Sequence, residues 1–198
     1  MHREYPDSHF YPDITQLNGA FLQLLAASGE PDTASVLAFR PEWRLALAQL
    51  APVQIEQISA VPCLLMSVGE TGCGIPPAGV EDSVAMASAV TAWEVERQLF
   101  VAGLLTFLRQ LSRQGSQLTR LAGVSSDFAR NLETTSLAQL RVLGASGAIG
   151  LQVRFAAHPR FWPDLLRSAG SDEPDAVTVS RLSVLPLMVS ERLAEFPV

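Results

Sequence analysis

The side chains that could bind a metal or attack a substrate are few and scattered in this chain of 198 residues. The two cysteines, Cys63 and Cys73, predict neither a disulfide framework nor a zinc site. The three histidines, His2, His9 and His158, do not have the spacing of metal ligands. We therefore expect no metal and no cofactor.

Patterns typical of catalysis or phosphate binding are not found either. The stretch GASGAIG at 144–150 has no strand before it, no helix after it and no Lys-Ser/Thr pair, so it predicts a turn into a strand. No G-x-S-x-G pattern occurs. Paired acids such as Glu81–Asp82 stand at expected helix starts, where solvated caps account for them. We predict that the protein is not an enzyme.

Arginine supplies all the lysine- or arginine-type positive charge of the chain, because the chain contains no lysine. The sequence predicts a partner-binding face made of five arginines: Arg44, Arg130, Arg141, Arg154 and Arg160. The alternative is a solvated surface with local ion pairs, which is the commoner situation. Two helix–turn–helix-like corners are expected, but their second helices, PVQIEQIS and SLAQLRVLG, contain no arginine and one arginine. We therefore do not expect the chain alone to read DNA bases directly.

Charge is distributed unevenly around a net value of −6. Residues 1–98 hold four arginines and twelve acids, whereas residues 99–198 hold ten arginines and eight acids. The arginines of the second half are expected to pair with the acidic half or with another subunit. The polar N-terminus does not have the pattern of a signal peptide, and the longest apolar run, LFVAGLLTFL, is about half of what crosses a bilayer. We expect a cytoplasmic protein.

Apolar residues recur with helical spacing along most of the chain, which predicts a mainly α fold. The expected helices cover residues 13–28, 40–50, 51–59, 80–114, 125–134, 136–144, 159–170 and 176–196. Residues 80–114 form one long helix or two, and the last helix is bent or delayed by Pro186. Short strands are expected at 62–68 and 148–155, and linkers at 69–79 and 171–175.

The chain also repeats itself with an offset of 85 residues. LAPVQIEQISAVPCLLMSV at 50–68 and TSLAQLRVLGASGAIGLQV at 135–153 each read as a helix, a turn and a strand. The offset matches Trp43 with Phe128 and Leu47 with Leu132, which predicts that all four lie in the core. Few residues are identical, so the shared apolar spacing supports the repeat; chance similarity of amphipathic helix pairs is the alternative.

The pattern of the repeat resembles the D subunit of the flagellar transcriptional master regulator, FlhD. The segment LAGVSSDFARNLETTSLAQLRVLGASGAIGLQVRF, 121–155, resembles the middle of that family, and PLMVSERLAEF, 186–196, resembles its later helical segment. In the first repeat, DITQLNGAFLQLLAAS resembles the family's opening helix and LAQLAPVQIEQIS its central helix. The resemblance implies two tandem FlhD-like units, 1–68 and 80–198, joined by a Gly/Pro linker at 69–79.

The resemblance implies small all-helical units that dimerise, each with one short strand. A single strand cannot satisfy its own backbone groups, so the two strands are expected to pair as an internal pseudo-dimer. It also implies a bacterial regulatory adaptor that forms homo- or hetero-oligomers and acts on transcription through protein partners, such as a zinc-bearing C subunit. The chain departs from the family by carrying two copies. A helical scaffold or accessory protein of a secretion or motility apparatus, with no role at DNA, is the alternative.

Overall fold

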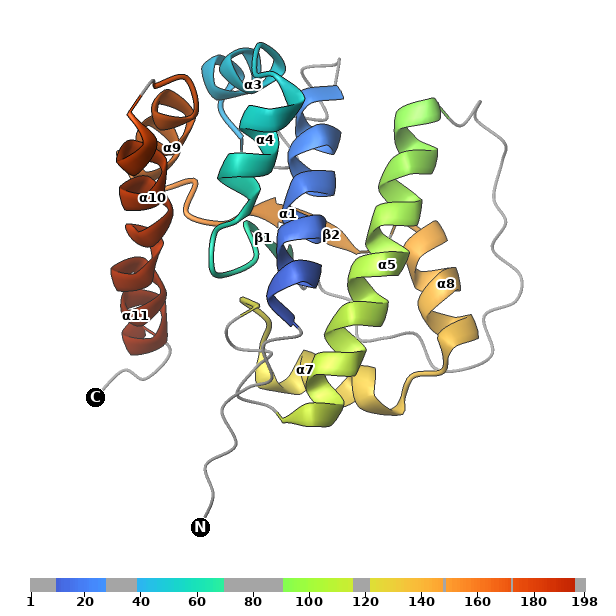
Figure 1. Ribbon diagram of the computed structural model, residues 1–198. Coiled ribbons are helices and arrows are strands. Elements are labelled where there is room, and N and C mark those ends of the chain that lie inside the picture. The colour runs from blue at the N-terminus through green and yellow to red at the C-terminus, as the bar shows by residue number, and fades with distance from the viewer. Residues whose placement is uncertain are drawn as a thin grey trace. The chain divides into compact units, whose positions relative to one another are not determined.

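The computed structural model describes residues 10–27, 39–69, 91–115, 122–147, 149–171 and 173–194, which are mainly helical (Figure 1). In the first part of the chain, α1 spans Phe10–Ala27, α3 Pro41–Ala48, α4 Pro52–Ser59 and β1 Met66–Gly69. Next come α5 (Ala92–Gln114), α7 (Ser126–Thr134), α8 (Leu137–Ala145) and β2 (Gly150–Val153). The last helices are α9 (Phe161–Ala169), α10 (Pro174–Leu182) and α11 (Val184–Ala194).

Local capping explains where the short helices begin. The Ser136 hydroxyl accepts a hydrogen bond from the Gln139 amide, and the Gln139 side chain accepts one from the Ser136 amide, which is a capping box. In α4, the Gln54 side chain accepts from the Ala51 amide in the same way, and Pro52 supplies the preset backbone angle of a first helical residue. Both helices therefore begin with a glutamine side chain that accepts a hydrogen bond from the amide of the residue before the helix.

The predicted repeat is present in the order and packing of the elements. Helices α7 and α8 begin 85 residues after α3 and α4, respectively. Helix α1 packs against α3 and α4, and α5 packs against α7 and α8 (Figure 1). Each repeat is thus one longer helix crossed by two short ones and followed by a strand.

The described residues form two compact units, which we call unit 1 and unit 2. Unit 1 holds α1, α3, α4, α9, α10 and α11, and unit 2 holds α5, α7 and α8. The chain passes from unit 1 to unit 2 after Ser67 within β1 and returns to unit 1 after Leu151 within β2; between these points, Gly123 also belongs to unit 1. Of the predicted linker 69–79, only Gly69 lies among the described residues, so the predicted domain limits remain a prediction.

Strands β1 and β2 pair in an antiparallel sheet, as predicted. The Arg154 amide donates to the Leu65 carbonyl at 2.9 Å, so these two residues lie opposite each other. The same register places Ser67 opposite Gln152. Because Gln152 follows Ser67 by the 85-residue offset of the repeat, the strands pair through equivalent residues. This register is unchanged when the two repeats are exchanged.

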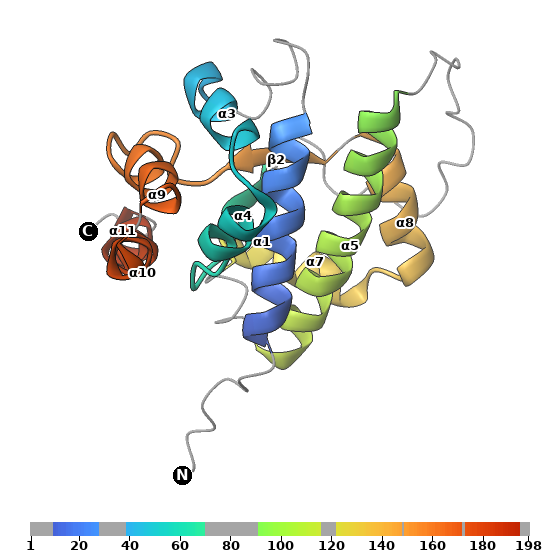
Figure 2. The same cartoon turned by 45° about the horizontal axis from the view of Figure 1, so that its top comes forward.

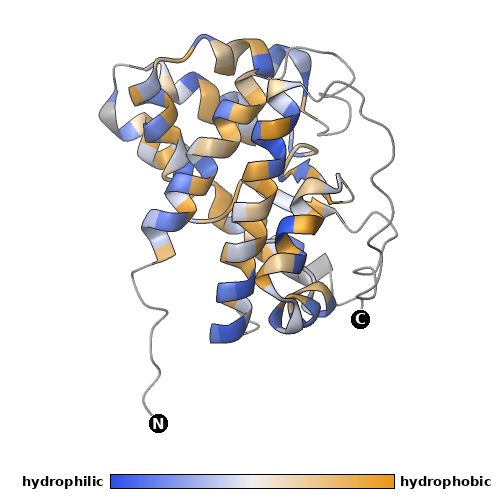
Figure 3. Ribbon diagram, turned by 90° about the vertical axis from the view of Figure 1, so that its right-hand side faces the viewer, coloured by the Kyte–Doolittle hydropathy of each residue, from blue (hydrophilic) through white to orange (hydrophobic). Residues whose placement is uncertain are grey.

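Each unit has its own apolar core, and the amphipathic colouring of the helices is visible in Figure 3. The equivalent residues Trp43 and Phe128 are 6% and 8% exposed, and Leu47 and Leu132 are fully buried, as predicted. The largest buried side chain of unit 1 is Trp162, which makes an edge-to-face contact with Phe39. The apolar positions that the repeat shares are therefore core positions.

The C-terminal segment differs in detail from the prediction. Residues Pro174 and Asp175, expected in a linker, form the first turn of α10, where proline is favourable. The expected helix over 176–196 is divided into α10 and α11 at Ser183. The ring of Pro186 would clash with the carbonyl four residues earlier, at Leu182, and this is where α10 ends. Within the described ranges, no helix has both the length and the apolar character needed to cross a membrane.

Candidate functional site

The five predicted arginines are divided between the two units. Arg44, Arg154 and Arg160 belong to unit 1, whereas Arg130 and Arg141 belong to unit 2. The structure therefore does not define one binding face from all five. The five arginines differ in how far they are buried and in the groups that they contact.

Arg154 is held inside unit 1 and is only 5% exposed. Its guanidinium donates to the Leu64 carbonyl at 3.1 Å and to the Glu191 carboxylate at 2.6 Å. It also lies over the Phe155 ring, 4.9 Å from the centroid. A Cβ added at Gly123, whose φ is +71°, would lie 2.8 Å from the Arg154 Nε, so glycine is needed there. Arg154 thus links β2 to α11 and is not available on an exposed face.

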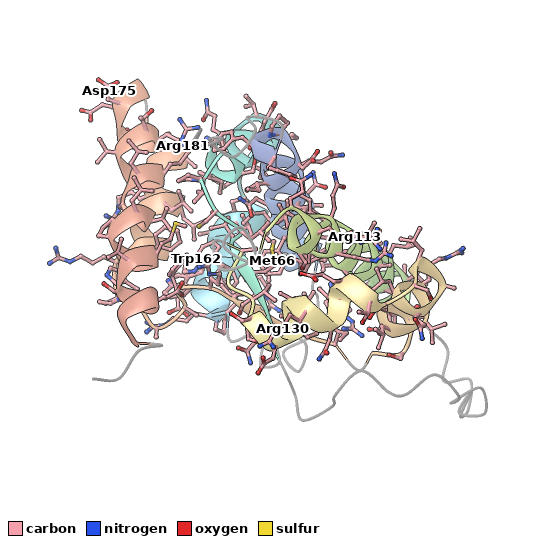
Figure 4. All side chains as sticks on the ribbon, turned by 90° about the horizontal axis from the view of Figure 1, so that it is seen from below. Met66, Arg113, Arg130, Trp162, Asp175 and Arg181 are labelled. Atoms are coloured by element: carbon pink, nitrogen blue, oxygen red, sulfur yellow. The ribbon has the colours of Figure 1, made fainter. Side chains whose placement is uncertain are left out.

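Three of the remaining arginines are exposed. Arg130, labelled in Figure 4, is exposed on α7 and pairs with Asp127 one turn earlier. Arg141 is exposed on α8, and Arg160 is exposed at the start of α9. Arg44 is half-buried on α3. An exposed pair such as Arg130–Asp127 contributes little to stability, so Arg130 can serve a surface role at little cost to the fold.

The exposed side of α8 combines Arg141 with apolar side chains. Leu137 and Val142 are 55% and 64% exposed and flank Arg141 along the helix. The equivalent positions of α4 are exposed too, and there Glu56 occupies the position of Arg141. The two repeats thus carry opposite charges at this helix position, and only α8 places Leu137 and Val142 beside the charge, because the equivalent residues of α4 are Pro52 and Gln57. Apolar side chains around one cation on a helix are typical of a protein-binding surface.

Asn18 is a buried polar residue that the sequence did not indicate. Its side chain is fully buried and makes three hydrogen bonds to the backbone at the end of α4 and in the segment that follows. The amide group donates to the Ser59 carbonyl at 3.0 Å and to the Cys63 carbonyl at 2.9 Å. The side-chain oxygen accepts from the Leu65 amide at 2.9 Å. Asn18 therefore fixes the segment that leads into β1.

Cys63 has no features of a reactive thiol. It is 1% exposed, and burial raises its pKa to about 11; Glu191 adds to this rise and Arg154 opposes it. Among the described residues, no group of three or more His, Cys, Asp and Glu side chains could hold a metal ion. His158 uses its Nδ1 to accept from the Phe161 amide at 3.0 Å and so caps α9. Cys73, His2 and His9 lie outside the described residues.

Comparisons with family models, with curated proteins and with solved structures find no match for this chain. The resemblance to FlhD therefore rests on the residues quoted above and on nothing further.

Proposed function

We propose that this protein is a non-enzymatic, FlhD-like regulatory adaptor that acts through protein partners in the control of motility or secretion genes. The observation that carries the proposal is the duplication. Two repeats with the same element order pair their strands through equivalent residues, Ser67 and Gln152. Pairing through equivalent strands is expected of two fused copies of a dimerising unit, and it supports the proposal.

The exposed side of α8 is the surface we assign to the partner. Leu137 and Val142 supply apolar contact area, and Arg141 supplies a charge that the equivalent surface of α4 reverses. Two equivalent helices with opposite charges can bind different partners, because a like charge across an interface is repelled. An adaptor connects different proteins, so two repeats that bind different partners are consistent with this function.

Purification of the tagged chain from its native cells, followed by mass spectrometry, tests the proposal. We expect a zinc-bearing, C-subunit-like protein to co-purify with the chain. The variant Arg141→Glu is expected to lower its recovery at least about tenfold, because the charge at the centre of the α8 surface is reversed. The control Arg167→Glu changes an arginine that is 76% exposed on α9 and should leave recovery unchanged. Equal recovery with both variants would remove α8 from the interface.

A helical scaffold or accessory protein of a secretion or motility apparatus is the second candidate function. It is favoured by the small number of basic side chains on α4 and α8, where α8 carries Arg141 alone and α4 carries no arginine. Structural components of such an apparatus in the purified complex would support it and contradict the transcriptional role. Specific binding of promoter DNA by the purified complex, with none by the chain alone, would decide for the adaptor.

A further inference from the structure

Helices α10 and α11 carry apolar side chains on the side that faces solvent. Four large residues are exposed within eleven positions of the chain: Val179 (68%), Leu182 (50%), Leu185 (46%) and Val189 (55%). We call these four the C-terminal stripe. At 100° per residue they fall within one side of a helix running through both segments. The two helices stack end to end in Figure 1 and are seen almost along their common axis in Figure 2.

The arrangement is the reverse of an ordinary surface helix. The opposite side of the same helices already supplies the buried residues Val177 and Val184, 7% and 0% exposed, and α10 packs there on α9 and α4. A helix that covers a core normally turns polar residues outward. Here the outward side is apolar as well. An apolar strip of this kind on a surface usually marks a binding site.

Among the side chains of α10 and α11 that the structure describes, the charged ones leave the centre of the stripe uncharged. Glu191 is bonded to the buried Arg154, and Arg181 is half-buried and donates to Thr178. Asp175 lies in the first turn of α10, beyond the end of the stripe, and is labelled with Arg181 in Figure 4. A partner at the stripe therefore needs a matching apolar surface and not an opposite charge.

The stripe is complementary to itself. Its order, Val-Leu-Leu-Val, is the same in both directions, and its spacings are three, three and four residues. When two such helices lie antiparallel, Val179 of each faces Val189 of the other, and Leu182 of each faces Leu185 of the other. Antiparallel packing also places the positive end of each helix dipole beside the negative end of its neighbour. A two-fold interface requires this kind of self-matching surface.

We propose that the C-terminal stripe binds the same stripe of a second copy of this chain, in antiparallel orientation, to form a symmetric homodimer. This interface is separate from the internal pairing of β1 with β2, and it does not depend on the proposed adaptor function. It leaves the exposed side of α8 free for a different partner.

Light scattering coupled to size exclusion, on the full chain at rising concentration, tests the proposal. The wild type should reach twice the chain mass of 21.3 kDa. Leu182→Glu and Leu185→Lys should each raise the dimer dissociation constant at least about tenfold, because a charge would be buried against leucine. Leu137→Glu, which changes an equally exposed leucine on α8, should leave the dimer intact. Circular dichroism verifies that each variant remains folded.

Mixing the two stripe variants tests whether residue 182 of one copy meets residue 185 of the other, as antiparallel pairing requires. Antiparallel pairing sets the glutamate of L182E against the lysine of L185K, so an equal mixture should form a heterodimer although neither variant dimerises alone. A wild-type chain that stays monomeric at about 100 µM would overturn the proposal, since the stripe would then be covered by another segment or reserved for another protein. A loss of dimer in L137E, or a mixture that remains monomeric, would overturn it too.

Discussion

Replacing Asn18 by alanine removes the side chain that holds the segment between α4 and β1. Three buried hydrogen bonds are lost, each with a net contribution of about 1 kcal/mol. The Leu65 amide would also remain buried without this acceptor, which costs about 1–3 kcal/mol. The higher helix propensity of alanine returns about 0.6 kcal/mol. We expect Asn18→Ala to lower the free energy of unfolding by about 3.5–5.5 kcal/mol, a large part of the stability of an ordinary domain.

Urea titration followed by circular dichroism measures this loss, and hydrogen exchange locates it. The control is Asn131→Ala, an asparagine exposed on α7, which should change the unfolding free energy by less than about 0.5 kcal/mol. In the wild type, the Leu65 amide should be protected from exchange, and in Asn18→Ala it should exchange far faster. A loss below about 1 kcal/mol, or a Leu65 amide that exchanges freely in the wild type, would refute the role assigned to Asn18.

Three further predictions concern single residues. Gly144→Ala should lower the free energy of unfolding in urea titration by about 1–3 kcal/mol, because its new Cβ would lie 2.9 Å from a side chain of α5. The control Gly103→Ala has nothing within 4 Å of its new Cβ and should raise the free energy of unfolding by up to about 1 kcal/mol. Equal effects of the two substitutions would contradict the close packing of α5 and α8. Arg154→Leu should cost about 2–4 kcal/mol and Arg130→Ala about 0–1 kcal/mol, since only the first side chain is buried and bonded; the same assay checks both. Cys63 should react slowly with iodoacetamide until the protein is unfolded, in a chain whose other cysteine is serine. Because burial raises the pKa of the Cys63 thiol, the folded state holds the thiol proton more tightly than the unfolded state does. The contribution of Cys63 to the free energy of unfolding is therefore complete below the ordinary pKa of 9.0 and is lost as pH rises through about 11. Fast labelling of the folded chain at pH 8 would show that the thiol is accessible and would contradict this prediction.

The sequence predicted well the features that depend on neighbouring residues. The starts of α7 and α8 follow from Ser125 and Ser136, whose hydroxyls accept from amides three residues later. The helix break near Pro186 follows from proline geometry, although its position at Ser183 was not predicted. The identity of the core positions Trp43 and Phe128 follows from helical spacing. These features depend on residues that are close together in the chain, so they can be predicted from the sequence alone.

Side chains that act over long distances in the chain were not predictable in the same way. Asn18 reads as an ordinary polar residue of a helix, and the 85-residue offset matches it with the exposed Gly103, so the repeat gave no indication of its role. Arginine is usually a surface residue, and the burial of Arg154 depends on its pairing with Glu191, 37 positions away in the chain. A helix was expected over the residues of the stripe, but the sequence does not indicate which side of that helix is buried.

What the sequence by itself determined is the set of elements, their order and their duplication, since helix caps, apolar spacing and the 85-residue offset are all local or periodic. What only the tertiary structure decided is how those elements are used. Helices α9, α10 and α11 cluster with α1, α3 and α4, and the strands adopt the one register that pairs Ser67 with Gln152. Packing selects one side of a helix and one register of a strand from several that local preferences allow equally, and that choice leaves the C-terminal stripe exposed.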